Sequence, residues 1–219
     1  MIVTVGNTKG GVGKTTLAMQ LALSRRLAGR DVLLIDADRQ GSAQTAVSIR
    51  AEAGRAPALS CVQYAEGKVL RAQVGALAAK HDDTIIGDSE ALRVALGRSD
   101  VLLVPVQPRA INVGALADIV ELVERAQEAR AEDNRPALRA FAVLNLADPD
   151  NTDAAKAVLD FPALLPLDGI VRRRKAVANA MANGLSVDEF TPRDPKACDE
   201  IGALCAGVFA GKEQAYGNN

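Results

Sequence analysis

Short apolar runs, rich in β-branched residues or leucine, recur along this chain between longer stretches with helical periodicity. Runs of this kind predict β-strands, and the stretches between them predict helices. The apolar runs are continuous rather than alternating, which is typical of strands that helices cover on both faces. The pattern therefore predicts an α/β fold with a doubly wound, mostly parallel sheet. The five strands expected are residues 2–5, 32–35, 84–86, 101–106 and 141–144.

Four helices can be predicted from the apolar spacing, at residues 14–28, 112–130, 172–183 and 195–210. Gly29, Gly184 and Gly211 stand just past three of these ends, where glycine commonly stops a helix. We find no internal repeat and no low-complexity linker. The sequence therefore predicts a single domain over residues 1–211, followed by a polar tail at 212–219 that we expect to fray.

Composition narrows the class of protein. A chain of 219 residues with 48% hydrophobic residues can bury the core of one domain. A formal charge of −1 and a pI near 5.9 argue against a protein that coats nucleic acid over its whole surface, so any DNA contact needs a local patch. The start of the chain does not resemble a signal peptide and no apolar run could span a bilayer, so a cytoplasmic location is expected.

The three cysteines form no CxxC pair, and their odd number suits free thiols in a reducing compartment better than a disulfide framework. We interpret them as core residues rather than metal ligands. They are Cys61, Cys198 and Cys205.

A glycine-rich loop follows the first predicted strand and precedes an amphipathic helix, which is the setting that a P-loop requires. Gly10, Gly11 and Gly13 carry no side chain that would block close approach, so backbone N–H groups can point at phosphate oxygens. The helix that follows adds the positive end of its dipole.

Side chains in the same loop suit a nucleoside triphosphate and a divalent cation. Lys14 is placed to reach the β- and γ-phosphates, and the Thr15 hydroxyl to ligate Mg²⁺. Thr16 is expected to contact the α-phosphate. The sequence thus predicts a site for ATP and Mg²⁺.

Two residues depart from the ordinary P-loop pattern, which would have glycine where Thr8 stands and has no use for Lys9. Residues 9–15, KGGVGKT, resemble the deviant Walker A motif KGGxGKT of the ParA/MinD ATPases. The resemblance implies a homodimer formed on ATP, in which Lys9 reaches the partner's nucleotide and stabilises charge on the phosphates. The nucleotide-binding set that it implies is Lys9, Gly10, Gly11, Val12, Gly13, Lys14, Thr15, Thr16 and Asn145.

A second motif follows the strand expected at 32–35. Residues 36–43 are similar to the family segment D-x-D-P-Q-G-N/S, with Arg39 where proline is usual. By resemblance, Asp38 positions the attacking water and Asp36 supports the Mg²⁺ shell. Carboxylates at i and i+2 on an extended strand end point the same way, which suits a shared water or metal. The alternative is that one of them only caps a helix.

Two further positions are ambiguous. Asp88 comes late after the strand expected at 84–86, so it is either an outer-sphere Mg²⁺ residue or a helix cap, unless a switch loop is absent between Ile86 and Gly87. Asn145 follows the last predicted strand and resembles the asparagine with which the family reads adenine. A plain turn residue is the alternative for Asn145.

The densest basic cluster is residues 172–175, at the start of a predicted helix, where positive charge opposes the helix dipole and should be compensated. Such a run is ordinarily a solvated face, but ParA-type dimers bind nonspecific DNA through a similarly placed surface. Residues 211–219 have no apolar face, which disfavours the membrane attachment of MinD relatives. The candidate DNA-binding residues are Arg172, Arg173, Arg174 and Lys175.

The resemblance to short ParA-type proteins implies an ATPase that dimerises on ATP, binds nucleoid DNA and partitions a plasmid or chromosome, with hydrolysis stimulated by a small centromere-binding partner protein. One alternative is a related ATPase that positions a protein cargo. Another is a small-molecule ligase such as a dethiobiotin synthetase, which Lys9 and Asp38 disfavour. The last alternative is a nucleotide-binding scaffold without turnover, which would apply if the segment around Asp88, where the family has its Walker B aspartate, is defective.

Overall fold

A parallel seven-stranded sheet forms the centre of the molecule in the computed structural model, which describes residues 1–88, 92–108, 113–148 and 161–216. The strand order is β3-β2-β4-β1-β5-β6-β7, and each neighbouring pair is parallel. This confirms the predicted fold class. The strands are β1 (Ile2–Gly6), β2 (Val32–Asp36), β3 (Ser60–Gln63), β4 (Asp83–Asp88), β5 (Val101–Val106), β6 (Arg139–Ala147) and β7 (Leu165–Arg172).

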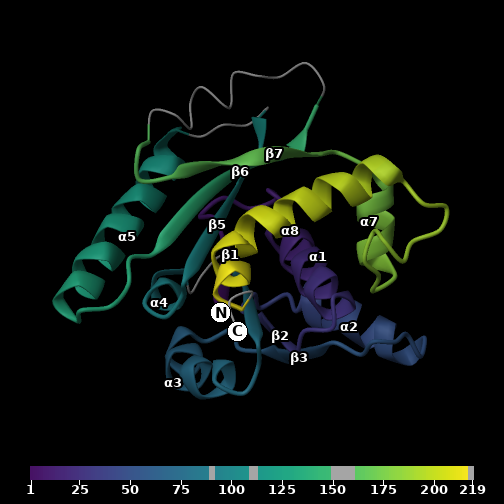
Figure 1. The fold of residues 1–219 in the computed structure, drawn as a ribbon, viewed down its shortest axis with the longest axis horizontal. Helices are drawn as coiled ribbons and strands as arrows, with labels where there is room; N and C mark the ends of the chain where they lie inside the picture. Colours follow the sequence, from purple (N-terminus) through teal and green to yellow (C-terminus); the bar gives the residue numbers. More distant parts are fainter. Residues whose placement is uncertain (89–91, 109–112, 149–160, 217–219) are drawn as a thin grey trace.

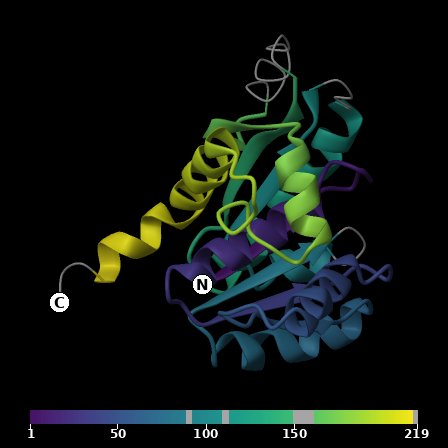
Figure 2. The same ribbon diagram turned by 90° about the vertical axis from the view of Figure 1, so that its right-hand side faces the viewer.

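Helices cover both faces of this sheet. Figure 1 shows α3, α4 and α5 on one side and α1, α7 and α8 on the other, with α2 beside α1 near the β3 edge. In Figure 2 the last turns of α8 project away from the body of the molecule. The helices are α1 (Lys14–Leu27), α2 (Ser42–Glu52), α3 (Gly67–Ala78), α4 (Leu92–Leu96), α5 (Val113–Glu132), α7 (Lys175–Ala182) and α8 (Pro195–Tyr216).

The core is divided by the sheet because successive side chains of a strand point to opposite faces. In β5, Val101 and Leu103 pack with α1 and α8, whereas Leu102 and Val104 pack with α4 and α5. All four side chains are fully buried. Burial on both faces explains why the inner strands read as continuous apolar runs.

The two strands that the apolar pattern misses, β3 and β7, are the edges of the sheet. β3 has only four residues, and its ends, Ser60 and Gln63, are exposed. In β7 the apolar run is broken by Pro166 and by Gly169, whose φ is 120°. An edge strand tolerates both residues because it has a neighbouring strand on one side only, so fewer of its backbone groups must form hydrogen bonds within the sheet. Short or interrupted edge strands therefore give little apolar signal.

Helices α2, α3 and α4 are also absent from the sequence prediction. The buried face of α2 consists of two alanines, Val47 and Arg50, so the helix has no clear apolar stripe. Its C-terminal arginine is buried, which the pattern could not anticipate.

Two predicted helix boundaries are wrong. The helix expected from residue 172 begins at Lys175, because Arg172 is still part of β7 and pairs with Ala147 of β6. The helix expected to stop at Gly211 instead continues to Tyr216 as α8, so residues 212–216 are helical rather than frayed. Gly184 does end α7 as predicted, with a φ of 65°.

Candidate functional site

The glycine-rich loop joins β1 in the middle of the sheet to the N-terminus of α1, as predicted. Gly13 is the N-cap of α1 and has a φ of 87°, in the left-handed region. A Cβ at Gly13 would lie 2.4 Å from Asn145 Nδ2, so a larger residue would both strain the backbone and clash. The loop conformation therefore depends on glycine at this position.

The loop fits a phosphate-bearing ligand. Within the described residues no side chain caps the N-terminus of α1, and its first turn contains no acidic residue. The N–H groups of that turn lack intrahelical partners and carry the positive end of the dipole. A Cβ at Gly10 or Gly11 would point into open space, so the backbone there can be approached closely. Backbone donors, a positive dipole end and an open approach suit an anion.

Lys14 lies at the first position of α1, and its side chain is 9% exposed. Its Nζ donates a hydrogen bond to the Lys9 carbonyl oxygen at 2.7 Å, so the ammonium group lies under the loop. A lysine in the first turn opposes the helix dipole, and a bound anion would remove that cost. Lys14 thus lies where the sequence places it, and its contact with phosphates stays a prediction.

Lys9 is held through its backbone. Its N–H donates to Asn7 Oδ1 at 2.9 Å, and Asn7 Nδ2 donates to the Pro105 carbonyl at the end of β5. Together with the bond from Lys14, these contacts fix the backbone of Lys9 within the loop.

Asn145 braces the loop from the other side. It lies in β6 and is 2% exposed, and its Nδ2 donates to the Val12 carbonyl at 2.7 Å. A plain turn residue is therefore the wrong interpretation of Asn145. The sequence did not predict the hydrogen bond from Asn145 to the P-loop. Recognition of adenine by Asn145 stays a prediction.

Asp36 ends β2 and is 1% exposed. Its Oδ2 accepts hydrogen bonds from the N–H groups of Ala43 and Gln44 at 2.8 and 3.0 Å, and its Oδ1 accepts one from Asp38 at 3.2 Å. The carboxylate therefore caps the start of α2, as the alternative interpretation holds. A role in the Mg²⁺ shell would have to be an outer one, because three N–H groups already occupy this carboxylate.

Asp38 is half-buried in the turn between β2 and α2. Its Oδ1 accepts a hydrogen bond from Gln40 N–H at 2.9 Å, and its carbonyl accepts one from Gln63 Nε2 of β3. The turn is thus fixed by local bonds and by the edge strand. Asp38 and the P-loop follow parallel strands, so both lie at the carboxyl edge of the sheet, where ligands bind in open α/β folds.

Asp88 is the last residue of β4 and lies opposite Gly6 at the start of the P-loop. Strand β4 is continuous through Ile86 and Gly87, in register with both β1 and β2. The side chain of Asp88 and residues 89–91 lie outside what the structure describes. The metal and capping interpretations of Asp88 therefore stay untested.

A cation at this site would have few protein ligands. Thr15 stands in the first turn of α1 and is half-buried. Among the described residues, no three histidine, cysteine or acidic side chains come together as a metal site. This fits Mg²⁺, which takes one or two protein ligands, phosphate oxygens and water.

The cysteines are free thiols, as predicted. Cys61 lies in β3, and burial together with the nearby Asp36 carboxylate raises its pKa to about 12. A thiol with such a pKa stays neutral and is a poor metal ligand or nucleophile.

The basic cluster at 172–175 is partly neutralised. Arg172 and Arg174 both bind the Glu200 carboxylate of α8, at 2.9 and 2.7 Å. Burial alone would raise the pKa of Glu200, but the hydrogen bonds from both arginines lower it. The Glu200 carboxylate thus supplies negative charge that offsets part of the positive charge at the start of α7, as expected from the sequence. Arg173 and Lys175 are exposed, and no ion pair to either is seen within the described residues.

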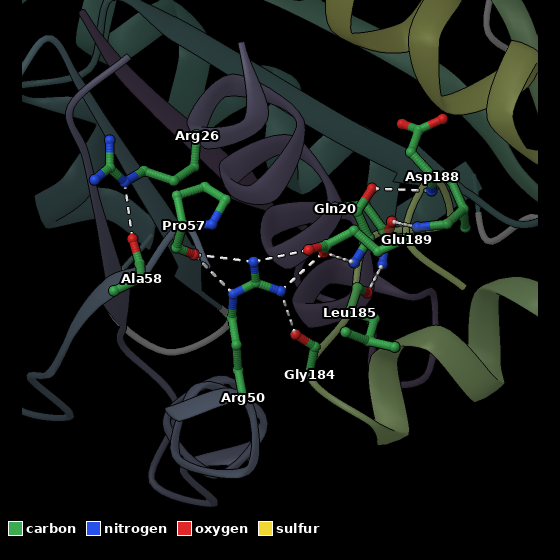
Figure 3. A network of polar contacts seen from close by, with 11 residues as sticks. Gln20, Arg26, Arg50, Pro57, Ala58, Gly184, Leu185, Asp188 and Glu189 are labelled. Atoms are coloured by element: carbon green, nitrogen blue, oxygen red, sulfur yellow. Dashed lines mark hydrogen bonds and ion pairs between the residues drawn. The ribbon is translucent and has the colours of Figure 1, made fainter. Parts of the chain in front are cut away.

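A buried polar network at the C-terminal end of α2 has no signature in the sequence. Figure 3 shows the Arg50 guanidinium between the Pro57 and Gly184 carbonyls and the Glu189 carboxylate. Arg50 belongs to α2, which begins at the Asp36–Asp38 turn, and Glu189 follows α7. The network therefore joins the helix after the second motif to the segment that carries the basic cluster.

Comparison with known protein families identifies the chain. The family profile CbiA, described as the CobQ/CobB/MinD/ParA nucleotide binding domain, matches residues 3–187. The chain belongs to this family. It is therefore a P-loop ATPase of the ParA/MinD type, as the deviant Walker A motif predicts.

Two ParA-type relatives match nearly the whole chain. Maintenance of carboxysome distribution protein A from Halothiobacillus neapolitanus is 29% identical over 94% of each chain. The protein of the same name from Gloeobacter kilaueensis is 32% identical over 89% of this chain and 87% of its own. The chromosome-partitioning ATPase Soj of Thermus thermophilus is 48% identical, but over 24% of this chain and 21% of its own.

Solved structures of ParA/MinD ATPases share the fold. An ATP complex of Cyanothece McdA matches with a TM-score of 0.70 and 17% identity over 95% of this chain and 96% of its own. MinD of Pyrococcus horikoshii OT3 with Mg-ADP matches with a TM-score of 0.71 and 16% identity over 99% and 97%. Both of these proteins are bound to an adenine nucleotide, and the second also to Mg²⁺. None of the helices within the described ranges is long and apolar enough to cross a bilayer.

Proposed function

We propose that this ATPase positions a protein cargo, an assembly such as a carboxysome or another microcompartment, by cycling on and off nucleoid DNA. The similarity along nearly the full length to two carboxysome-distribution proteins carries this proposal. It favours the cargo alternative of the sequence analysis over plasmid or chromosome partition.

Partition stays the second candidate because the Soj match is 48% identical. That match spans only 52 residues, however, about a quarter of this chain. A short match of this kind supports a common nucleotide cycle more than a common cargo.

In the proposed cycle, ATP binds with its phosphates over the N-terminus of α1, where Lys14 and the loop N–H groups contact them. Thr15 and, through water, Asp36 would hold Mg²⁺, which would offset negative charge on the phosphates. Asp38 orients the water for attack on the γ-phosphate, and Lys9 of one protomer stabilises the phosphates bound by its partner. A partner protein linked to the cargo speeds hydrolysis and so releases the dimer from DNA.

The Lys9→Ala variant is expected to bind ATP with wild-type affinity but to remain monomeric. The Asn7 and Lys14 bonds to the Lys9 backbone survive this substitution, so the loop keeps its shape. Only the side chain that reaches the partner is lost. Light scattering after size exclusion in Mg²⁺ and ATP measures the mass, and titration with a fluorescent ATP analogue measures the affinity. A wild-type dimer of this variant would contradict the cross-dimer role.

The Arg173→Ala/Lys175→Ala variant is expected to lose most ATP-dependent retention on nonspecific duplex DNA. These two cations are exposed, whereas Arg172 and Arg174 are paired with Glu200. Each lost phosphate contact should reduce the slope of log affinity against log salt by about 0.9. Retention on immobilised DNA at several salt concentrations measures both quantities.

The matched control is Arg55→Ala/Lys80→Ala, which removes the same formal charge at two exposed positions elsewhere. It should retain DNA almost as the wild type does. Equal salt slopes for the two double variants would place the DNA surface away from residues 172–175.

Deletion of the gene in its host tests the cargo itself. The expected result is that tagged microcompartments cluster instead of spacing evenly, while the rate of plasmid loss is unchanged. The reverse result, plasmid loss with normal microcompartment spacing, would favour partition and overturn the proposal.

A further inference from the structure

A second basic site lies on the opposite edge of the sheet from the P-loop. Gly97 and Arg98 precede β5 and Arg135 precedes β6, whereas the P-loop follows the end of β1, which is parallel to both. A pocket of about 590 Å³ opens there between α3, α4 and α5, which lie side by side in Figure 1. Six arginines line this arginine pocket: Arg71, Arg93, Arg98, Arg125, Arg130 and Arg135.

Two of these arginines are held in place by hydrogen bonds to backbone carbonyls. Arg130 is 3% exposed, and its guanidinium donates to the Pro136 and Ser99 carbonyls at 2.6 and 2.7 Å. Arg135 donates to the Gly97 carbonyl at 2.6 Å. Burial and the adjacent Arg135 charge lower the pKa of Arg130. Carbonyl groups hold these side chains in place, and Asp100, whose charge favours the protonated form of Arg130, does not line the pocket.

The exposed arginines of the pocket are short of counter-charges. Arg125 pairs with Glu121, but Arg71, Arg93 and Arg98 have no ion pair or side-chain hydrogen bond within the described part of the chain. Asp133 is the single acidic residue of the lining as described. Guanidinium groups from three helices thus converge, and their mutual repulsion is relieved when an anion binds between them.

We infer that the arginine pocket binds a ligand carrying several phosphate groups, separate from the nucleotide at the P-loop. A guanidinium group can donate two parallel hydrogen bonds to two oxygens of one phosphate group. Several guanidinium groups around one pocket therefore suit a polyphosphate better than a single carboxylate. The volume is within the range of small-ligand sites. The phosphates could belong to a small molecule or to a nucleic-acid backbone. The inference does not depend on the cargo proposed above.

Equilibrium dialysis with inorganic tripolyphosphate tests the site, with the P-loop saturated by excess ADP. The expected result is one additional site per chain, weakened at least tenfold in the Arg93→Ala/Arg98→Ala variant. Both side chains are exposed, so the variant should fold, and a wild-type thermal midpoint verifies this. Arg55→Ala/Lys80→Ala, which lies outside the pocket, should bind as the wild type does.

A short DNA duplex added as a competitor identifies the source of the phosphates. Displacement of tripolyphosphate from the wild type would assign the pocket to a nucleic-acid backbone, and its absence to a small polyphosphorylated ligand. Either result supports a phosphate site. The inference is overturned if the ADP-saturated protein binds no tripolyphosphate, or if the pocket variant and the control variant bind it equally.

Discussion

The Lys14→Ala variant is expected to lose ATP binding by a factor of about 100 or more, and ATP hydrolysis with it. A charge-assisted hydrogen bond to a phosphate contributes about 1.5–3 kcal/mol, and a factor of ten corresponds to about 1.4 kcal/mol. Lys14 is the buried cation of the first turn of α1, which has no acidic residue. Titration with a fluorescent ATP analogue and a phosphate-release assay measure the two losses.

The control for this prediction is Lys80→Ala, the same substitution at an exposed lysine after α3. It should bind and hydrolyse ATP as the wild type does. Urea unfolding of the Lys14 variant separates loss of the phosphate contact from loss of the fold, since its Nζ also holds the Lys9 carbonyl. Tight ATP binding by a folded Lys14→Ala protein would mean that the nucleotide is held elsewhere.

The parts of the site that are contiguous in sequence could be predicted from it. Strand, glycine loop and helix follow one another within residues 2–27, so Lys14 and Gly13 are placed by local geometry alone. Asp36 was placed correctly at the end of a buried strand. Its three N–H partners could not be foreseen, because they depend on where α2 turns back toward β2.

Contacts between distant segments left no local signal. Asn145 contacts Val12 across 133 positions, and two arginines of the cluster at 172–175 pair with Glu200 from a helix that follows it. The arginine pocket gathers side chains from α3, α4 and α5, each of which alone looks like an ordinary solvated face. Such groupings depend on how helices pack on the sheet, and apolar periodicity does not report the packing of polar side chains.

The second large effect is expected at Arg50, where the Arg50→Met variant should lose about 3–5 kcal/mol of unfolding free energy. Breaking a buried ion pair by removing one partner costs this much. The Glu189 side chain is 17% exposed, so we expect the lower end of the range, with much of the loss from the Pro57 and Gly184 carbonyls that lose their donors. Arg50 is 1% exposed and makes five hydrogen bonds, two of them to Glu189 at 2.8 and 2.9 Å. Methionine keeps much of the volume, so the loss would come mainly from the polar contacts.

Urea unfolding of three variants separates the possible causes. Arg55→Met, at an exposed position just after α2, should change stability by less than about 0.5 kcal/mol. Arg50→Met/Glu189→Leu removes both charges and should recover part of the loss. If Arg50→Met changes the free energy of unfolding by less than about 1 kcal/mol, water replaces the guanidinium and the network does not stabilise the packing of α2 against the Gly184–Glu189 turn.

The Arg50 network also has a consequence for DNA binding. It fixes the C-terminal half of α2 to the Gly184–Glu189 turn, which Gln20 of α1 holds from the other side through Leu185 and Val187. In the proposed cycle, a movement of the Asp36–Asp38 turn on ATP binding would be passed to the segment after α7 through these buried bonds rather than through exposed side chains. At a urea concentration where Arg50→Met is still folded, its DNA retention should depend less on ATP than that of the wild type. Retention that stays fully ATP-dependent would mean that the signal reaches the basic cluster by another path.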